Sequence, residues 1–145
     1  MNKKIKWILV ISWMIIIFWF SNQPAVISDE KSKLVIYAFK ALGLNLDSIL
    51  GDLANFIVRK VAHFTEYLIL YVLLFNTLLE DFNFKKSLIA SLFIVFVYAC
   101  SDEIHQIFIP GRTARIRDVI IDTCGGSFAM LVIYLKQKNL LKKKP

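Results

Sequence analysis

The chain has 145 residues, of which 57% are hydrophobic, 14% aromatic and 20% charged, and its formal net charge is +7. The apolar fraction lies above the soluble-protein norm of roughly half, and the charged fraction lies below the usual quarter. These values exclude a disordered chain and argue against an ordinary soluble domain, so the length predicts one membrane domain over residues 1–145.

Four apolar segments are long enough to cross a bilayer, which takes about 20 helical residues. The first follows a basic start, so a cleavable signal peptide is the competing interpretation. Its bulky end at Trp19 and Phe20, with no small-x-small site, favours a retained span. The expected spans are residues 5–21, 55–79, 86–107 and 116–135. The predicted fold class is therefore all-α, an integral membrane bundle of four transmembrane helices.

The connection between the first two spans, residues 22–52, is the longest in the chain. Within it, Leu34, Tyr37, Ala38 and Leu42 recur near helical spacing, with lysines on the other positions. This pattern predicts a short amphipathic helix that lies on the membrane surface in the first external loop. Gly43 is a suitable residue to end it.

The basic residues favour cytoplasmic N- and C-termini. In that orientation the inner flanks hold ten Lys and Arg residues, including Lys143 and Lys144, and the outer side holds eight. Only Glu80 and Asp81 are acidic on the inner side, so the formal charges are about +8 inside and −1 outside. Because the basic residues frame the spans and form no stripe with exposed aromatics, the lipid bilayer is an expected partner and nucleic acid is not.

Polar and ionisable residues, which are unfavourable in the hydrocarbon layer, fall in one shallow layer below the predicted outer boundary of the membrane. With a rise of about 1.5 Å per residue, Lys60 lies near that boundary, and Glu66 and Asp122 each lie about 9 Å below it. The layer draws on all four apolar segments: Ser21 and Gln23; Lys60, His63, Glu66 and Tyr67; Asp102, Glu103, His105 and Gln106; Asp118 and Asp122.

Helical spacing assigns faces to these residues. Asp118 and Asp122 share an arc of about 100° with Gly125 and Gly126, and such small residues let a helix approach its neighbour closely. Glu103 is expected to point elsewhere on its helix, toward the flank of the bundle or the interface.

Ionisable groups in a bilayer usually face a partner or a watery cavity, so we expect an outward-facing polar cup between the helices. The candidate catalytic residues are His63, Glu66, Asp102 and His105, since imidazole titrates near neutrality and burial tunes carboxylates. The same four are the candidate ligands of a divalent metal, which is the candidate cofactor. Their spacing matches no zinc signature, and the competing interpretation for each is a structural network that ties the helices together.

The loop before the fourth span presents arginines to the cup. Pro110 and Gly111 form a turn beside Arg112, whose planar guanidinium can bind phosphate or carboxylate through two hydrogen bonds. For Arg115 and Arg117 we expect anchorage at lipid headgroups or pairing with nearby aspartates. The predicted ligand-binding residues are Ser21, Gln23, Lys60, Tyr67, Glu103, Gln106, Arg112, Asp118 and Asp122.

Four sequence blocks resemble those of the VanZ-like family, in the same order and over nearly the whole chain. They read FWFSNQPA, RKVAHFTEY, SDEIHQIFIPGR and DVIIDTCGG. The resemblance implies a small membrane protein of the bacterial cell membrane with about four spans, in a family whose named member is associated with teicoplanin resistance. Asp122 stands where the family pattern leads us to expect asparagine, which adds one negative charge to the cup.

Two classes of function follow from the predicted site and the resemblance. The first is an envelope protein that recognises a lipid-linked precursor or a glycopeptide-like ligand and so alters susceptibility to teicoplanin-type antibiotics. The second is an intramembrane hydrolase or transferase acting on a phosphate-containing lipid headgroup. In it, Arg112 and Lys60 hold the anion and a histidine acts as acid or base. A proton-coupled transporter is disfavoured because the polar layer does not continue toward the cytoplasmic side.

Overall fold

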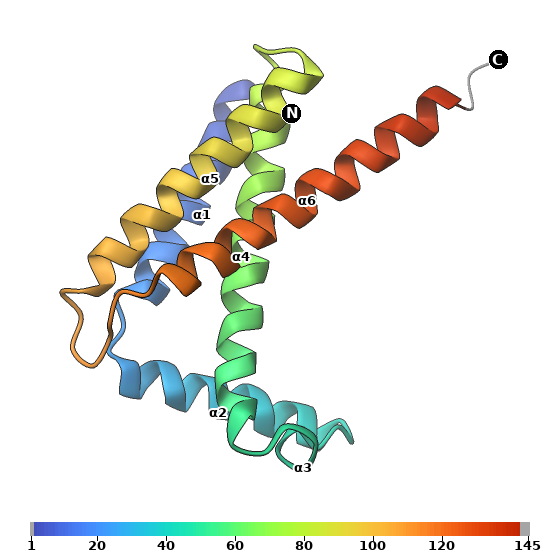
Figure 1. The fold of residues 1–145 in the computed structure, drawn as a ribbon. Coiled ribbons are helices and arrows are strands. Elements are labelled where there is room, and N and C mark those ends of the chain that lie inside the picture. Colours follow the sequence, from blue (N-terminus) through green and yellow to red (C-terminus); the bar gives the residue numbers. More distant parts are fainter. Residues whose placement is uncertain (1, 143–145) are drawn as a thin grey trace.

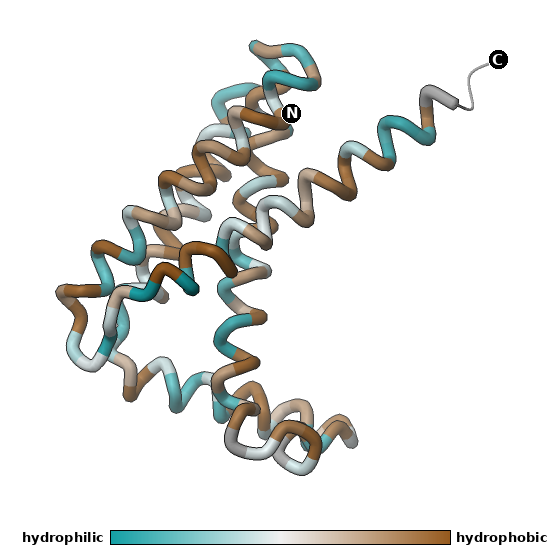
Figure 2. Tube along the Cα trace, in the orientation of Figure 1, coloured by the Kyte–Doolittle hydropathy of each residue, from teal (hydrophilic) through white to brown (hydrophobic). Residues whose placement is uncertain are grey.

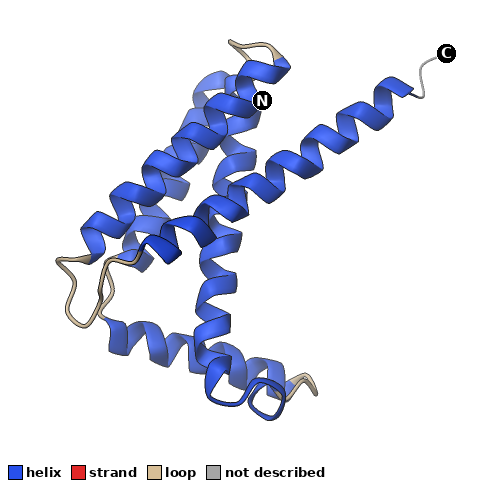
Figure 3. Ribbon diagram, viewed as in Figure 1, coloured by secondary structure: helices blue, strands red, loops and turns tan. Residues whose placement is uncertain are grey.

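The computed structural model describes residues 2–142, and in these residues every regular element is a helix (Figure 1, Figure 3). Lys143 and Lys144, which we counted on the inner side, lie outside the described residues. The elements in chain order are α1 (Lys3–Ser21), α2 (Ala25–Ala41), α3 (Leu46–Leu50), the 3-10 turn η1 (Gly51–Leu53), α4 (Ala54–Leu78), α5 (Phe84–Gln106) and α6 (Ile116–Lys142). The predicted all-α fold is confirmed.

Four helices are long and apolar enough to cross a membrane: α1, α4, α5 and residues 116–140 of α6. Apolar residues run along the middle of these helices, and hydrophilic residues gather toward their ends (Figure 2). The first three expected spans agree with α1, α4 and α5 to within two residues at each end. The fourth expected span ends at residue 135, whereas its helix α6 continues to Lys142, since Lys136 and Lys138 end the apolar run but are good helix formers.

The amphipathic helix expected in the long connection is α2. It begins after Pro24 and ends before Gly43, whose φ of 88° is a conformation typical of glycine at a helix end. Leu34 and Tyr37 are 66% and 62% exposed, so the rest of the chain leaves this apolar face uncovered. The helix lies across one end of the bundle, and both termini lie toward the other end (Figure 1).

The core gathers around α4. Tyr67, Leu70 and Tyr71 of α4 are fully buried, together with Val95 of α5 and Ile17 of α1. Packing of these large side chains against one another fixes the positions of α1, α4 and α5 relative to each other.

Two glycines set the distance at which α6 crosses the bundle. A Cβ atom on Gly125 would collide with the backbone carbonyl of Phe64 in α4, and one on Gly126 would lie 2.8 Å from Cγ1 of Val95 in α5. The predicted close approach through small residues is therefore confirmed. Beyond this crossing α6 leans away from the other helices (Figure 1), and Leu131 and Leu135 are about half exposed.

Candidate functional site

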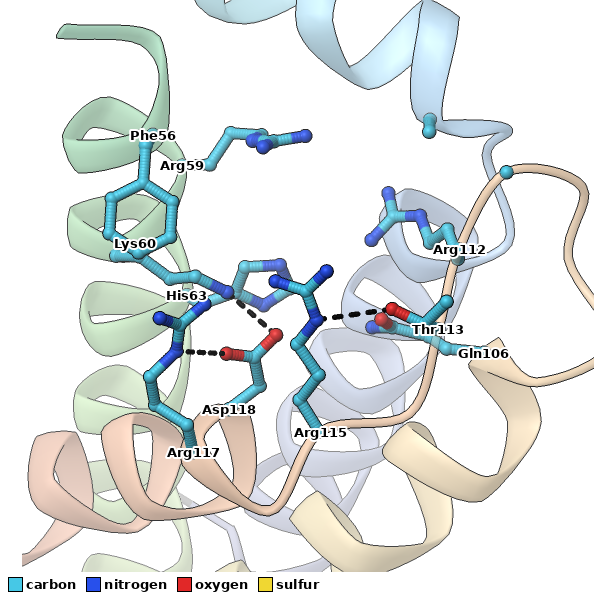
Figure 4. Close-up of a pocket in the computed structure, with 12 residues that line it drawn as sticks. Phe56, Arg59, Lys60, His63, Gln106, Arg112, Thr113, Arg115, Arg117 and Asp118 are labelled. Atoms are coloured by element: carbon cyan, nitrogen blue, oxygen red, sulfur yellow. Dashed lines mark hydrogen bonds and ion pairs between the residues drawn. The ribbon is translucent and has the colours of Figure 1, made fainter. Parts of the chain in front are cut away.

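A cavity of about 130 Å³ lies between α4, the start of α6 and the loop that precedes it (Figure 4). Five cationic side chains line it, and Asp118 is the single acidic residue in its wall. We call it the cationic cavity. Its cations are Arg59, Lys60, Arg112, Arg115 and Arg117.

Asp118 balances only part of this positive charge. Its Oδ2 lies 2.8 Å from Lys60 Nζ, and its Oδ1 lies 3.7 Å from Arg117 Nε (Figure 4). Arg59 pairs instead with Asp29 of α2. Among the side chains that the structure describes, Arg112 and Arg115 form no ion pair, so the cavity keeps an excess of positive charge.

Arg112 is held by its own loop against the start of α2. Its Nε donates a hydrogen bond of 2.9 Å to the carbonyl oxygen of Gln23, and the backbone N–H of Ala25 donates to the carbonyl of Pro110 at 3.3 Å. Gly111 adopts a φ of 76°, which favours glycine in this turn. Burial lowers the pKa of Arg112, and the like charge of Arg59 lowers it further. An anion placed beside this guanidinium would relieve both effects.

A second cavity of about 210 Å³ adjoins the first, between α1, α2 and α4. We call it the side cavity. Phe20, Val35 and Val58 are among its lining residues, so it is more apolar than its neighbour. Three residues line both cavities: Arg59, His63 and Arg112. A ligand with a charged part and an apolar part can therefore occupy both at once.

Deeper in the bundle a histidine and three carboxylates lie close together. His63 Nδ1 is 3.6 Å from Glu66 Oε2 and 3.9 Å from Asp122 Oδ1. One possible ligand atom from each of His63, Asp102 and Asp122 lies within 4.8 Å of the other two. We call His63, Glu66, Asp102 and Asp122 the histidine–carboxylate cluster. It differs from the expected metal set, since Asp122 replaces His105.

Neutral groups orient Asp102. Ser21 Oγ donates to Asp102 Oδ2 at 2.8 Å, and Gln106 Nε2 donates to Ser21 Oγ at 2.7 Å and to the same carboxylate oxygen at 3.2 Å. These bonds tie α1 to α5, as the structural interpretation predicts. They satisfy only one oxygen of Asp102.

Several other atoms of the cluster, and the hydroxyl of the neighbouring Tyr67, have no such partners. Among the described side chains, the buried atoms without a hydrogen-bond partner include His63 Nδ1, Glu66 Oε2, Tyr67 Oη and Asp102 Oδ1. Most buried polar atoms in proteins are hydrogen bonded. The cluster is thus not a closed, fully paired network, and its free atoms can receive a ligand.

His105 and Glu103 do not lie where the sequence suggested. The Nε2 of His105 is 3.1 Å from Asn22 Oδ1, and its ring lies 4.6 Å from that of Phe18, so this histidine contacts the end of α1 and lines neither cavity. Glu103 does not lie on an open flank of the bundle, which was one of the two expectations for it. Glu103 is 5% exposed and accepts a hydrogen bond of 2.5 Å from the backbone N–H of Arg115, because the loop before α6 folds over it.

Sequence reasoning missed two residues of the cationic cavity. Arg59 was left out although it precedes Lys60, and a basic pair beside a polar layer was the available signal. Phe56 gave no signal, yet its ring centroid lies 5.5 Å from Lys60 Nζ and 5.0 Å from Arg117 Cζ. Arg117 pairs with Asp118, which is one of the two alternatives expected for it, and both Arg115 and Arg117 line the cavity.

Comparison with known proteins gives one match. A family model described as VanZ/LLP1 matches residues 6–137, nearly the whole chain, and so confirms the resemblance carried by the four sequence blocks. No curated protein and no solved structure matches the chain.

Proposed function

The chain belongs to the VanZ/LLP1 family, and we propose that it is a cell-envelope membrane protein that recognises the anionic headgroup of a lipid-linked precursor. In this proposal the protein lies in a bacterial cell membrane with both termini in the cytoplasm, and the two cavities open to the outer face. Occupation of the site alters susceptibility to teicoplanin-type glycopeptides, which act at that face. A glycopeptide-like ligand is the alternative occupant.

The excess of cations in the cationic cavity is the observation that carries this proposal. Five cationic side chains face one described carboxylate there, and the guanidinium groups of Arg112 and Arg115 form no ion pair with any described side chain. Arginine binds phosphate through two parallel hydrogen bonds, and charge-assisted bonds of this kind are about twice as strong as neutral ones. The cationic cavity therefore suits a headgroup that contains phosphate best.

The side cavity favours a lipid over a free anion. It shares Arg59, His63 and Arg112 with the cationic cavity, and it continues between α1 and α2 along apolar side chains such as Val35. A phosphate held by the shared arginines would leave an attached hydrocarbon chain beside this apolar wall. Burial of that chain adds affinity in proportion to the apolar area removed from water.

A binding experiment with the purified full chain in lipid nanodiscs tests the proposal. The probes are a polyprenyl phosphate, the corresponding polyprenol and inorganic phosphate. We expect the polyprenyl phosphate to bind most tightly, and Arg112→Gln to weaken it about tenfold or more, since a hydrogen bond to a charged group contributes roughly 1.5–3 kcal/mol. Lys33→Gln removes an exposed charge outside both cavities and serves as the matched control. Equal binding of polyprenol, or unchanged binding by Arg112→Gln, would contradict the proposal.

The link to antibiotics is tested separately in cells. Deletion of the gene should change teicoplanin susceptibility, and the intact gene should restore it where the Arg112→Gln variant does not. If deletion and restoration leave both susceptibility and envelope lipid composition unchanged, the antibiotic link is wrong even where the lipid binds.

An intramembrane hydrolase is the second candidate, and the position of His63 favours it. This histidine lines both cavities, and its Nδ1 has no hydrogen-bond partner among the described residues. Water would add across the P–O bond and yield the lipid alcohol and free phosphate, with imidazole taking the proton from water. Phosphate release from the polyprenyl phosphate measures this activity. Loss in His63→Ala with retention in His105→Ala supports the assignment, and retention in both refutes it.

A further inference from the structure

We propose that His63, Asp102 and Asp122 bind one divalent transition-metal ion, and that Zn²⁺ is the ion their chemistry suits best. The site lies between α4, α5 and α6, next to the cavities but deeper in the bundle. It goes beyond the proposed lipid recognition and does not rest on it.

The geometry is close to that of a three-ligand zinc site. Zinc binds nitrogen and oxygen at about 2.0–2.2 Å, so tetrahedral ligand atoms lie roughly 3.4 Å apart. One ligand atom from each of the three side chains already lies within 4.8 Å of the others, and His63 Nδ1 is 3.9 Å from Asp122 Oδ1. Small side-chain rotations bring such atoms to bonding distance.

Charge balance also calls for a cation at this point. Asp102 and Asp122 are 4% and 3% exposed, and no Lys or Arg forms an ion pair with either of them in the described chain. Lys60, the nearest lysine in sequence to His63, is paired with Asp118. Two ionised carboxylates without a cation are unfavourable in an apolar bundle and would take up protons instead. One divalent ion in place of those protons also makes the group electrically neutral.

Two of these three side chains carry a buried atom with no hydrogen-bond partner among the described residues. These atoms are Asp102 Oδ1 and His63 Nδ1. The other oxygen of Asp102 accepts bonds from Ser21 and Gln106, which hold the carboxylate in place. Outer partners of this type commonly orient metal ligands. One oxygen is thus fixed by the protein, and the other is free for the metal.

The ligand types select the ion. Mg²⁺ and Ca²⁺ prefer oxygen ligands alone, whereas imidazole is typical of zinc and its transition-metal neighbours. Three protein ligands leave the fourth zinc position open, which is the arrangement of catalytic sites. Because His63 also lines both cavities, that position is accessible to a ligand held there. In this arrangement His63 is a metal ligand and not the acid or base of the second candidate function.

Zinc binding by the full chain, purified in detergent and stripped with chelator, tests the site. Equilibrium dialysis against Zn²⁺ followed by elemental analysis should give about one ion per chain. Asp122→Asn and His63→Gln should each weaken binding at least 10- to 100-fold, a loss already seen when only outer partners are removed. His105→Gln is the matched control, because this second histidine lies outside the group, and it should retain the ion.

Two further measurements remain decisive where a variant fails to fold. Zn²⁺ should raise the unfolding temperature of the unaltered protein, and Mg²⁺ at the same concentration should not. Co²⁺ in place of Zn²⁺ should give the strong visible absorption of a low-symmetry, four-coordinate ion. Absence of bound Zn²⁺ in the unaltered protein, equal binding by all three variants, or loss of the ion in His105→Gln would overturn the proposal.

Discussion

The contact between Gly125 and the backbone of α4 leads to a specific prediction for Gly125→Ala. The added Cβ would overlap the carbonyl oxygen of Phe64 and lie 3.0 Å from its carbon and 3.2 Å from the amide nitrogen of Leu68. All three are backbone atoms, so no side chain can rotate away. To restore ordinary contact distances, α6 has to move from α4 by roughly 1 Å.

The expected loss of stability follows from two opposing effects. Overpacking in a tight core costs about 1–3 kcal/mol, and a rigid backbone neighbour puts Gly125→Ala near the upper end of that range. Replacing glycine by alanine inside a helix returns about 0.5–1 kcal/mol. We therefore expect a net decrease of about 2 kcal/mol in the free energy of unfolding.

Gly126→Ala is the matched control, because it adds the same methyl group one residue away. Its Cβ would meet the side-chain methyl of Val95 at 2.8 Å, and that side chain can shift. We expect a change of less than about 1 kcal/mol. Reversible unfolding in mixed micelles of mild detergent and dodecyl sulfate, followed by far-UV circular dichroism, measures both. Equal stability of the two variants, or a Gly125→Ala protein as stable as the unaltered chain, would refute the packing argument.

Three further predictions concern polar pairs at the two ends of the bundle. Lys60→Met should lower the free energy of unfolding by about 2 kcal/mol, between the values for exposed and buried ion pairs, and adding Asp118→Asn should recover part of it in the same micelle assay. Ser21→Ala should cost about 1–3 kcal/mol, because it removes a hydrogen bond to the buried aspartate of α5, and Ser21→Thr should cost less. Glu80 accepts a hydrogen bond from Lys6, which lowers the pKa of this carboxyl group below its ordinary value. The pair therefore stabilises the fold at neutral pH and loses its effect as the pH falls through the lowered value. NMR titration of Glu80 should show a higher pKa in Lys6→Met, and an unchanged pKa would contradict the pairing.

The helices could be predicted because their signals are local. An apolar run of about 20 residues predicts a span wherever the partner helices lie, and period and capping residues located α2 in the same way. Gly125 and Gly126, one turn after Asp122, likewise predicted a close helix crossing, since small residues are typical of helix–helix contacts in membranes. In each of these cases the information lies within one segment.

The cavities could not be predicted to the same degree, because they depend on how helices and loops that are distant in the sequence pack against one another. Glu103 was placed on the flank or the interface from its angle on α5, but the loop before α6 covers that flank and uses the carboxylate. Asp102 and His105 lie three residues apart on one helix, yet only Asp102 reaches the histidine–carboxylate cluster, because α1 ends against His105. The ion pair between Arg59 and Asp29 forms only because α2 folds back and places Asp29 beside α4. These outcomes require the positions of neighbouring helices.

The way α6 leaves the bundle bears on how ligand affinity has to be measured. The helix is anchored on α4 at Gly125, and its later turns extend alone, with Leu131 and Leu135 about half exposed (Figure 1). The helix also packs on α5 through Gly126, so its free later turns extend from a crossing that is supported on two sides, and Asp118 and Asp122 lie on the other side of that crossing. A membrane helix can accommodate a change of bilayer thickness by tilting or kinking. Because α6 is one continuous helix, we expect a tilt of its uncovered turns to shift both aspartates. Micelles impose no such thickness. Affinities should therefore be compared within one micelle system or between bilayers of the same hydrocarbon depth, and not between the two.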